Sequence, residues 1–182
     1  MTWYPQSPRV KARLTGAFWL VVFVAGTLSL SFRGGVLFSA LTLVGTLCYL
    51  VVTLLLYDLL KPVNRTVALL AALFGIVGCV ISLFHLTPVI HVRDLVFFGL
   101  QCVLVGYLIY RSTFLPRILG ALLVLAGLGW LTFVSPSLVT ALSPYNLIPG
   151  MIGEGLLLLW LLVKGVDVER WNERAVKSSD SP

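Results

Sequence analysis

The fold of this chain is decided by the stretch LTGAFWLVVFVAGTLSLSF-RGG-VLFSALTLVGTLCYLVVTLLLYDLL, from Leu14 to Leu60. Two long apolar segments, Leu14–Phe32 and Val36–Leu60, are separated there only by Arg33-Gly34-Gly35. A helix that crosses the hydrocarbon core needs about 20 apolar residues, and it satisfies its own backbone hydrogen bonds. The stretch therefore predicts two antiparallel membrane-spanning helices joined by a tight turn.

Four further apolar segments follow this hairpin. Proline-containing turns and loops at residues 61–65, 85–93, 111–117 and 135–145 separate them. The predicted fold is all-α, a polytopic bundle of six transmembrane helices that occupies residues 1–165. The expected spans are 14–32, 36–60, 66–84, 94–110, 118–134 and 146–163.

The composition excludes the soluble and the disordered classes of protein. Of the 182 residues, 59% are apolar and only 11% are charged, and the mean hydropathy is +1.01. Soluble domains are about half apolar and about a quarter charged, and disordered chains are poor in apolar residues. The composition therefore indicates an integral membrane protein.

The distribution of basic residues predicts the orientation in the membrane. If both termini are cytoplasmic, 11 of the 13 Lys and Arg residues lie on the inner side, and only Arg33 and Arg93 lie outside. Basic residues concentrate in cytoplasmic loops, so we expect an N-in/C-in protein of the cytoplasmic (inner) membrane. This clustering explains the net charge of +6 without nucleic acid as a partner. The first span is longer than a signal-peptide core of about 7–15 residues and is expected to be retained.

Residues 166–182 form a charged tail that we expect on the cytoplasmic side. Residues 166–174 mix charged groups with Trp171, a pattern typical of a short interfacial helix whose indole lies among the lipid headgroups. A frayed, solvated terminus explains the same composition. Ser178–Pro182 are expected to be disordered.

Glu154 is the polar residue that most requires an explanation. It precedes Lys164 by ten residues, so a helix places it about 15 Å from the inner end, near the bilayer centre. Gln101 precedes Arg111 by the same number of residues and is expected at a similar depth. We expect Glu154 and Gln101 to form the floor of an intramembrane polar pocket, hydrogen-bonded to each other. A hydrogen bond that only fixes helix pairing is the structural alternative.

Three residues at the outer end of the helix that carries Gln101 are candidate ligand-binding residues at the mouth of this pocket: Asp94, His91 and Arg93. His91, Asp94 and Gln101 follow the three-and-four spacing of one helical face. Asp94 is also explained as a first-turn carboxylate that the helix dipole favours.

The sequence predicts no metal site and identifies no cofactor. Two histidines, His85 and His91, are too few for a zinc or haem site. The three cysteines lie in apolar segments without C-x-x-C spacing and are expected to be packing residues. Asp58 stands three residues before Lys61, as expected of an ion pair on one helical face.

Several short runs resemble one protein family. They are GYLIYRS (106–112), FLPRILG (114–120), GE (153–154) leading to LWLLVKGV (159–166), and the turn LKPVNR (60–65). These runs are similar to the bacterial domain-of-unknown-function family 4386, and the similarity covers nearly the whole chain. It implies a small bacterial multi-helix membrane protein and no particular activity. The chain departs from the family in its very short turn at 33–35.

These observations favour one function over two alternatives. The preferred function is binding of a small or lipid-like ligand in an outward-opening pocket built on Glu154 and Gln101. Glu154 is the candidate catalytic acid or base if a reaction takes place there, and whether the chain is an enzyme stays open. The alternatives are proton- or cation-coupled transport by a homo-oligomer, and a structural or assembly role beside another membrane protein.

Overall fold

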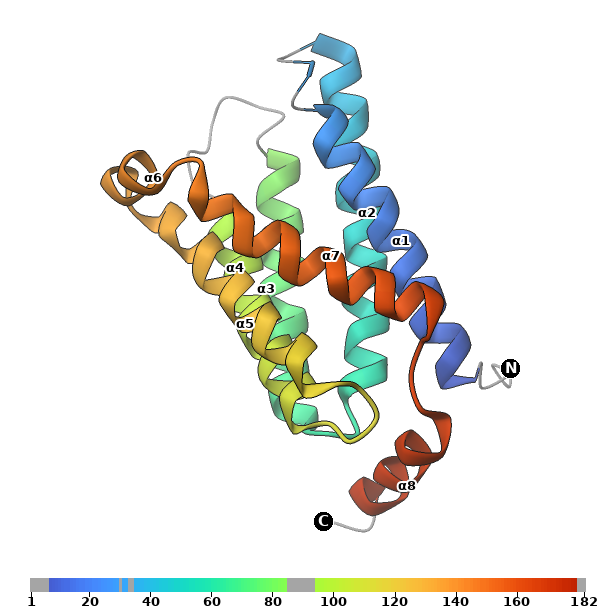
Figure 1. Cartoon of the computed structure of the whole chain (residues 1–182). Helices are drawn as coiled ribbons and strands as arrows, with labels where there is room; N and C mark the ends of the chain where they lie inside the picture. The colour runs from blue at the N-terminus through green and yellow to red at the C-terminus, as the bar shows by residue number, and fades with distance from the viewer. Residues whose placement is uncertain (1–6, 30, 33–34, 85–93, 180–182) are drawn as a thin grey trace.

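We describe the fold from a computed structural model of the whole chain (Figure 1). The structure describes residues 7–29, 31–32, 35–84 and 94–179. Within these ranges it contains helices and turns and no strand. The prediction of an all-α fold is confirmed.

In the described part of the chain, six helices are long and apolar enough to cross a membrane, as the sequence predicts. The first four spans are single helices, α1 (Pro8–Ser29), α2 (Gly35–Leu60), α3 (Arg65–Phe84) and α4 (Asp94–Arg111). The fifth span is α5 (Arg117–Leu131), which the 3₁₀ helix η1 (Thr132–Val134) extends. The sixth is α7 (Ile148–Val163), preceded by the 3₁₀ helix η2 (Tyr145–Leu147).

α1 begins earlier than the apolar segment that predicted it. The helix starts at Pro8, and the carbonyl oxygen of Ser7 accepts the backbone N–H groups of Val10 and Lys11. Proline suits the first position of a helix, where its missing N–H has no partner to lose. The basic head therefore forms the first turns of α1 rather than a loop before it.

Two short helices lie outside the six spans. α6 (Pro136–Leu142) forms where the sequence predicted a loop, and its first residue is again a proline. α8 (Val168–Ser179) occupies most of the tail and contains Ser178 and Ser179, which we expected to be disordered. The remaining residues of that expected disordered segment, 180–182, lie outside the described residues.

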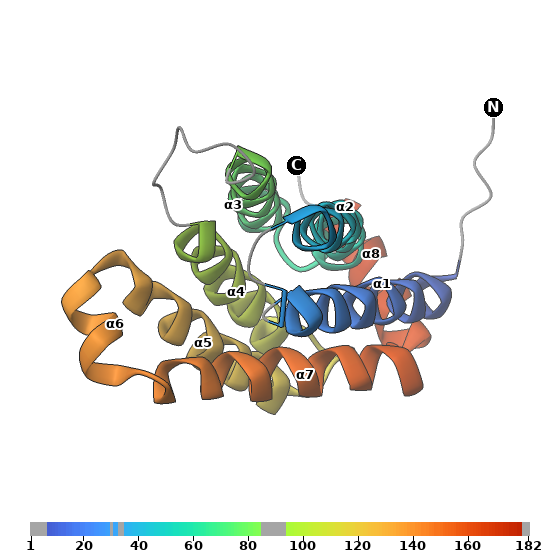
Figure 2. The ribbon, with the colours of Figure 1, turned by 90° about the horizontal axis from the view of Figure 1, so that it is seen from above.

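The spanning helices form a closed ring when the bundle is seen end-on (Figure 2). From α1 to α5 each helix packs against the next one in the chain, and α7 packs against both α5 and α1. Figure 1 shows α7 running obliquely across one face of the bundle. α7 therefore closes the ring, and its inner side faces the interior.

Glycines set the distance between α4 and α5. A Cβ atom added to Gly106 would lie 2.7 Å from the carbonyl oxygen of Gly120, and one added to Gly127 would lie 2.6 Å from that of Gly99. Distances this short are not tolerated, so the two backbones touch where no side chain intervenes. Small residues at helix interfaces allow such close packing in membranes, and the glycines of α4 and α5 have this role here.

α7 approaches α1 in the same way and then ends abruptly. A Cβ on Gly16 of α1 would lie 2.6 Å from the backbone nitrogen of Leu162. Gly165 follows α7 with φ of +73°, a left-handed conformation that glycine adopts at helix C-termini. Its N–H bonds the carbonyl oxygen of Trp160, and the chain turns there toward α8.

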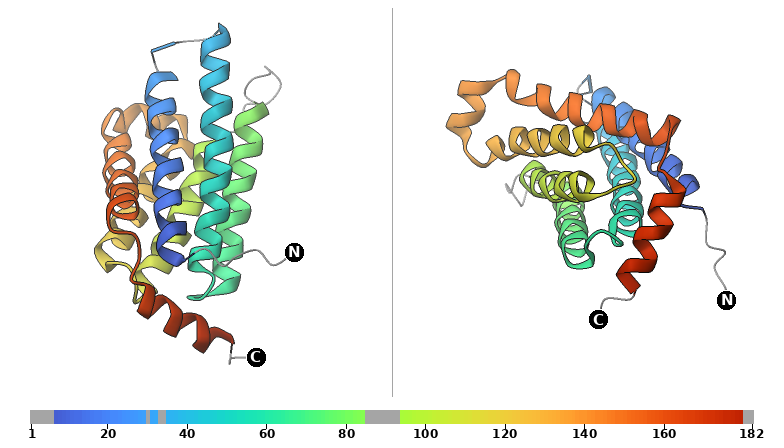
Figure 3. Two further views of the ribbon diagram at one scale, coloured as in Figure 1. Left: turned by 90° about the vertical axis from the view of Figure 1, so that its right-hand side faces the viewer. Right: turned by 60° about the horizontal axis from the view of Figure 1, so that its bottom comes forward.

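One end of the bundle, which we call the basic end, contains the start of α1 and the turns α2–α3 and α4–α5. It also contains the end of α7 and all of α8, which lies across it (Figure 3). Eleven basic residues belong to it: Arg9, Lys11, Arg13, Lys61, Arg65, Arg111, Arg117, Lys164, Arg170, Arg174 and Lys177. The side of the membrane that this end faces stays a prediction.

Candidate functional site

Glu154 lies inside the ring of helices, at the end of the second turn of α7. Only 6% of its surface is exposed. The neighbouring Gly153 brings α7 close to α5, since a Cβ there would lie 2.5 Å from the carbonyl oxygen of Leu122. The close approach encloses the carboxyl group between helices in the middle of the bundle.

Three side chains from three other helices donate hydrogen bonds to this carboxyl group. The indole Nε1 of Trp130 (α5) lies 2.5 Å from Oε1 of Glu154, and the thiol Sγ of Cys102 (α4) lies 3.6 Å from the same oxygen. The indole Nε1 of Trp19 (α1) lies 3.3 Å from Oε2. Glu154 therefore joins α7 to α1, α4 and α5 at one point.

The two indoles are held in place by packing. Trp19 is 1% exposed, and its ring meets that of Tyr49 edge-on with centroids 6.4 Å apart. The ring of Trp130 lies against Gly150, where an added Cβ would fall 2.3 Å from Cζ2 of the indole. Gly150 precedes Glu154 by one helical turn, so its missing side chain allows the indole to reach the carboxyl group.

The donors around Glu154 are all electrically neutral. In the described part of the chain no Lys, Arg or His side chain contacts this carboxyl group. An indole N–H only donates, whereas a thiol is both a weak donor and a weak acceptor. This set of donors suits a group that accepts hydrogen bonds, and a carboxylate only accepts them.

Gln101 does not bond Glu154, contrary to our expectation from their depths. Its Nε2 donates instead to Oγ1 of Thr53 on α2, at 3.1 Å. Successive residues point about 100° apart around a helix, and Cys102 is the one that faces α7. Gln101 therefore faces α2 and α3, where Gly75 leaves room for its amide, as an added Cβ would lie 2.4 Å from Oε1.

The Oε1 atom of Gln101 is buried and has no hydrogen-bond partner among the described residues. A narrow cavity of about 10 Å³ lies next to Gln101 between α2, α3 and α4, lined also by Thr53 and Ala72. Gln101 is thus part of the polar interior, although on a different side of α4 from the carboxyl group.

Of the three residues predicted at the mouth of the pocket, the structure describes Asp94 alone. Asp94 starts α4, where its carboxylate accepts the N–H of Leu95 and the hydroxyl of Ser82 on α3. These bonds fit the capping interpretation, and a role in ligand binding stays a prediction. His91 and Arg93 lie outside the described residues, as does His85.

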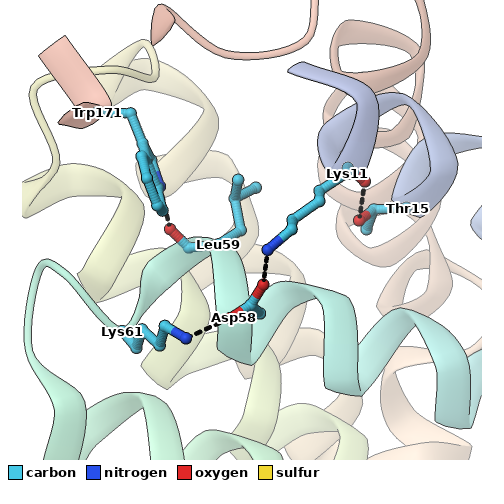
Figure 4. A network of polar contacts seen from close by, with 6 residues as sticks. All are labelled: Lys11, Thr15, Asp58, Leu59, Lys61 and Trp171. Carbon is cyan, nitrogen blue, oxygen red and sulfur yellow. Dashed lines mark hydrogen bonds and ion pairs between the residues drawn. The ribbon is translucent and has the colours of Figure 1, made fainter. Parts of the chain in front are cut away.

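Asp58 lies at the basic end and bonds two lysines (Figure 4). The predicted pair with Lys61 is confirmed, and Lys11 on α1 is a second partner. Lys11 was missed because it lies 47 residues away in the sequence, on the neighbouring helix of the ring. The contact with Lys11 ties α1 to α2, and both contacts are structural features of the basic end.

The sequence identified Glu154 but not the groups that bond it. The sequence feature that points to these partners is the indole N–H group of Trp19 and of Trp130, which lies within an apolar span and needs an acceptor there. Cys102 packs in the buried core, as predicted, and its thiol also donates to Glu154, which was not predicted. Cys79 and Cys48 are free thiols, and the thiol of Cys79 donates to the carbonyl oxygen of Thr46. The described residues contain no group of side chains that suits a metal ion.

Comparison with known families agrees with the resemblance of the short sequence runs. The model of the family described as "Domain of unknown function (DUF4386)" matches residues 31–95 and 90–165, which include Cys102, Trp130 and Glu154. This chain belongs to the DUF4386 family. Trp19 lies before the residues that match the family model, so α1 adds this donor from outside the matched region.

A related sequence comes from an archaeon. An uncharacterized protein of Archaeoglobus fulgidus is 36% identical over 125 residues, covering 63% of this chain and 75% of the relative. No solved structure matches the chain. The family description and the name of the relative state no activity, so the function is argued from the site.

Proposed function

We propose that this DUF4386 protein is a multi-pass protein of the prokaryotic cytoplasmic membrane in which Glu154 binds and releases a proton. We further propose that this change of charge drives proton-coupled transport of a solute. The observation that carries the proposal is a carboxyl group buried inside a spanning bundle and bonded, among the described residues, only by neutral donors from three other helices.

The neutral shell supports the proton as the species that changes at this site. A charged carboxylate in an apolar interior is costly unless a cation or strong hydrogen bonds compensate it. Hydrogen bonds to a charged group are about twice as strong as neutral ones, and three of them meet here. Because no cation among the described residues pairs with Glu154, the carboxyl group is able to change its protonation state without breaking an ion pair there.

Protonation of Glu154 changes how α7 is held. The neutral acid carries an O–H group that needs an acceptor, while the two indoles offer only donors. The bonds from Trp19 and Trp130 also weaken once the carboxyl group loses its charge. The charged form therefore holds α7 against α1 and α5 more firmly than the neutral form does, which is the two-state element that coupling requires.

The charge distribution and the size of the bundle complete the proposal. The eleven basic residues of the basic end favour a cytoplasmic location for that end. Six helices packed around an enclosed carboxyl group leave little room for a solute path in one copy, so we propose a homo-oligomer as the transporting unit.

Infrared difference spectroscopy tests protonation of Glu154 directly. The purified protein in lipid vesicles is titrated with acid, and the carbonyl stretch of a newly protonated carboxylic acid is followed. Beside the bands of the exposed carboxyl groups, we expect a band of a buried carboxylic acid in the wild type that is lost in Glu154→Gln and retained in Glu169→Gln, a matched change in the tail. The same vesicles, loaded with a pH-sensitive dye, should show proton uptake only where Glu154 is present. A spectrum unchanged by Glu154→Gln rejects the proposal.

Binding of a small or lipid-like ligand is the second candidate function. The buried Oε1 atom of Gln101, which lacks a partner among the described residues, favours it, because such an oxygen accepts a hydrogen bond from a ligand hydroxyl or amine. Asp94, His91 and Arg93 would serve this ligand from the outer end. Native mass spectrometry of the same preparations separates the two candidates, since a bound molecule lost in Gln101→Leu and Glu154→Gln supports the ligand site.

A further inference from the structure

A groove of about 750 Å³ lies at the basic end, between α8 and the turn that joins α2 to α3. The turn provides one wall with Lys61, Val63 and Arg65, and α8 provides the other with Trp171 and Arg174. Figure 3 shows α8 passing beside the end of α2 and the start of α3. The groove therefore lies where the spanning segments end and the lipid headgroups begin.

The charges that line this groove all have one sign. Four of its lining residues are basic, and none is acidic: Lys61, Arg65, Arg174 and Lys177. Arg65 is exposed and Arg174 is half-buried, and neither has an acidic partner in the described part of the chain. Lys61 bonds Asp58 (Figure 4), yet its ammonium group carries two further N–H donors. The groove thus offers several donors to one anion.

Apolar and aromatic surface lies next to these donors. Tyr57, Val63, Trp171 and Ala175 line the same groove, and Tyr57 belongs to the last turns of the spanning helix α2. A small anion from solution gains nothing from contact with an apolar surface. A phospholipid, in contrast, has a charged phosphate followed by an apolar glycerol and acyl region that can pack against it. The combination fits an amphipathic ligand that enters from the bilayer.

The two walls of the groove are fixed relative to each other. The indole Nε1 of Trp171 donates to the carbonyl oxygen of Leu59 at 2.8 Å, which attaches α8 to the end of α2 (Figure 4). The guanidinium of Arg170 donates to the carbonyl oxygen of Thr113 at 3.3 Å. Since α8 is held by these bonds, the basic groups form a built site rather than a flexible basic tail.

We infer that this groove binds the headgroup of an anionic phospholipid, with its phosphate among Lys61, Arg65 and Arg174. The acyl chains extend along α2 and α3 into the bilayer. Guanidinium groups bind phosphate oxygens through paired, charge-assisted hydrogen bonds, and basic pockets at the ends of spanning helices suit acidic lipids. The inference does not depend on Glu154.

Native mass spectrometry of the full-length protein with added lipids tests this inference. We expect one phosphatidylglycerol molecule to remain bound, while phosphatidylcholine at equal concentration dissociates. The double variant Arg65→Gln with Arg174→Gln should bind phosphatidylglycerol about 25-fold more weakly, since each basic group near a membrane surface contributes about 1 kcal/mol, or about fivefold. The charge-preserving pair Arg65→Lys with Arg174→Lys should retain most of the binding and shows that both positions tolerate substitution.

The matched control removes two basic residues of the same end that do not line the groove, Arg111→Gln with Arg117→Gln. An equal loss of binding in this control would indicate general attraction to the basic end and would overturn the inference. Inorganic phosphate is the second probe. If it displaces phosphatidylglycerol when present at a similar concentration, the groove is a site for free anions and the lipid assignment is wrong.

Discussion

Glu154 is bonded by donors that come from three separate helices, and each of the two indole donors depends on a neighbour that leaves it space or fixes its ring. Trp130 reaches the carboxyl group because Gly150 has no side chain, and Trp19 is fixed against Tyr49. A hydrogen bond to a charged group stabilises a protein by about 1.5–3 kcal/mol, more than a neutral one. The site therefore contributes to the stability of the bundle as well as to its proposed chemistry.

Replacing Trp130 by phenylalanine removes one of these donors. We expect Trp130→Phe to lower the free energy of unfolding by about 1.5–3 kcal/mol more than Trp160→Phe. Trp160 is the matched control because its indole stacks on Lys164, with Nζ 4.5 Å from the ring centroid, and makes no bond to Glu154. Unfolding by denaturing detergent, followed by helical circular dichroism, measures the difference.

The same comparison in a Glu154→Leu background identifies the source of the effect. If the bond to the carboxyl group is responsible, the two tryptophan variants should then differ little, because the shared partner is gone. A difference that persists without Glu154 would mean that Trp130 acts through packing alone.

At the scale of single residues, the sequence predicts that Glu154 lies within the bundle but does not predict which side chains bond it. A carboxyl group ten residues from the end of an apolar span is conspicuous, since depth follows from counting residues. The direction of a side chain around its helix does not follow from depth. Gln101 and Cys102 have almost the same depth, and only the packing of α4 between α3 and α5 decides which of them faces Glu154.

Among the elements, α4 and α5 form the closest pair, and their glycines make this contact possible. Gly106 and Gly120 face each other so closely that a methyl group on either would meet the backbone of the other helix. Close backbone contact is a main source of helix association in membranes, where both helix and lipid are apolar. Cys102 and Trp130 lie on these two helices, so their spacing also positions two donors of the site.

Gly106→Ala tests this contact with the smallest possible change. We expect a loss of about 1–3 kcal/mol in the free energy of unfolding, because the added methyl group forces α4 and α5 apart. Gly26→Ala in α1 is the matched control, since a Cβ there meets nothing within 4 Å. The control should stabilise the protein by up to about 1 kcal/mol through helix propensity. Equal effects at both positions would show that the α4–α5 contact tolerates an extra methyl group.

The elements themselves are mostly predictable, because length and apolar character define a spanning helix. The six spans follow from the sequence in this way. α6 was missed since a segment with Pro136 and Pro144 has the composition of a loop, although Pro136 occupies a helix start. The extra turns of α1 were missed because basic residues outside the bilayer core carry no hydropathy signal.

The whole molecule is a ring that α7 closes, with eleven basic residues gathered at one end and α8 lying across that end. Neither feature is contained in any single segment. The closure depends on Gly16 and Gly153, which let α7 approach both α1 and α5. α8 depends on long-range bonds, of which the contact between Trp171 and Leu59 spans 112 residues. Because such contacts join distant parts of the chain, they are determined by packing and not by local pattern.

Removing the indole of Trp171 tests whether α8 is a fixed part of the molecule. In Trp171→Ala we expect α8 to detach from α2 while the six spanning helices stay folded, because the bundle makes its own contacts and α8 loses its main attachment. Hydrogen exchange measured by mass spectrometry should then show faster exchange of the backbone amides of residues 168–179 and unchanged exchange in the spans.

Asn172→Ala, a change at an exposed neighbouring position, is the control and should leave α8 as protected as in the wild type. Slow exchange of α8 in both variants would mean that the membrane surface, rather than the contact with Leu59, holds this helix, and the groove beside it would then have one movable wall.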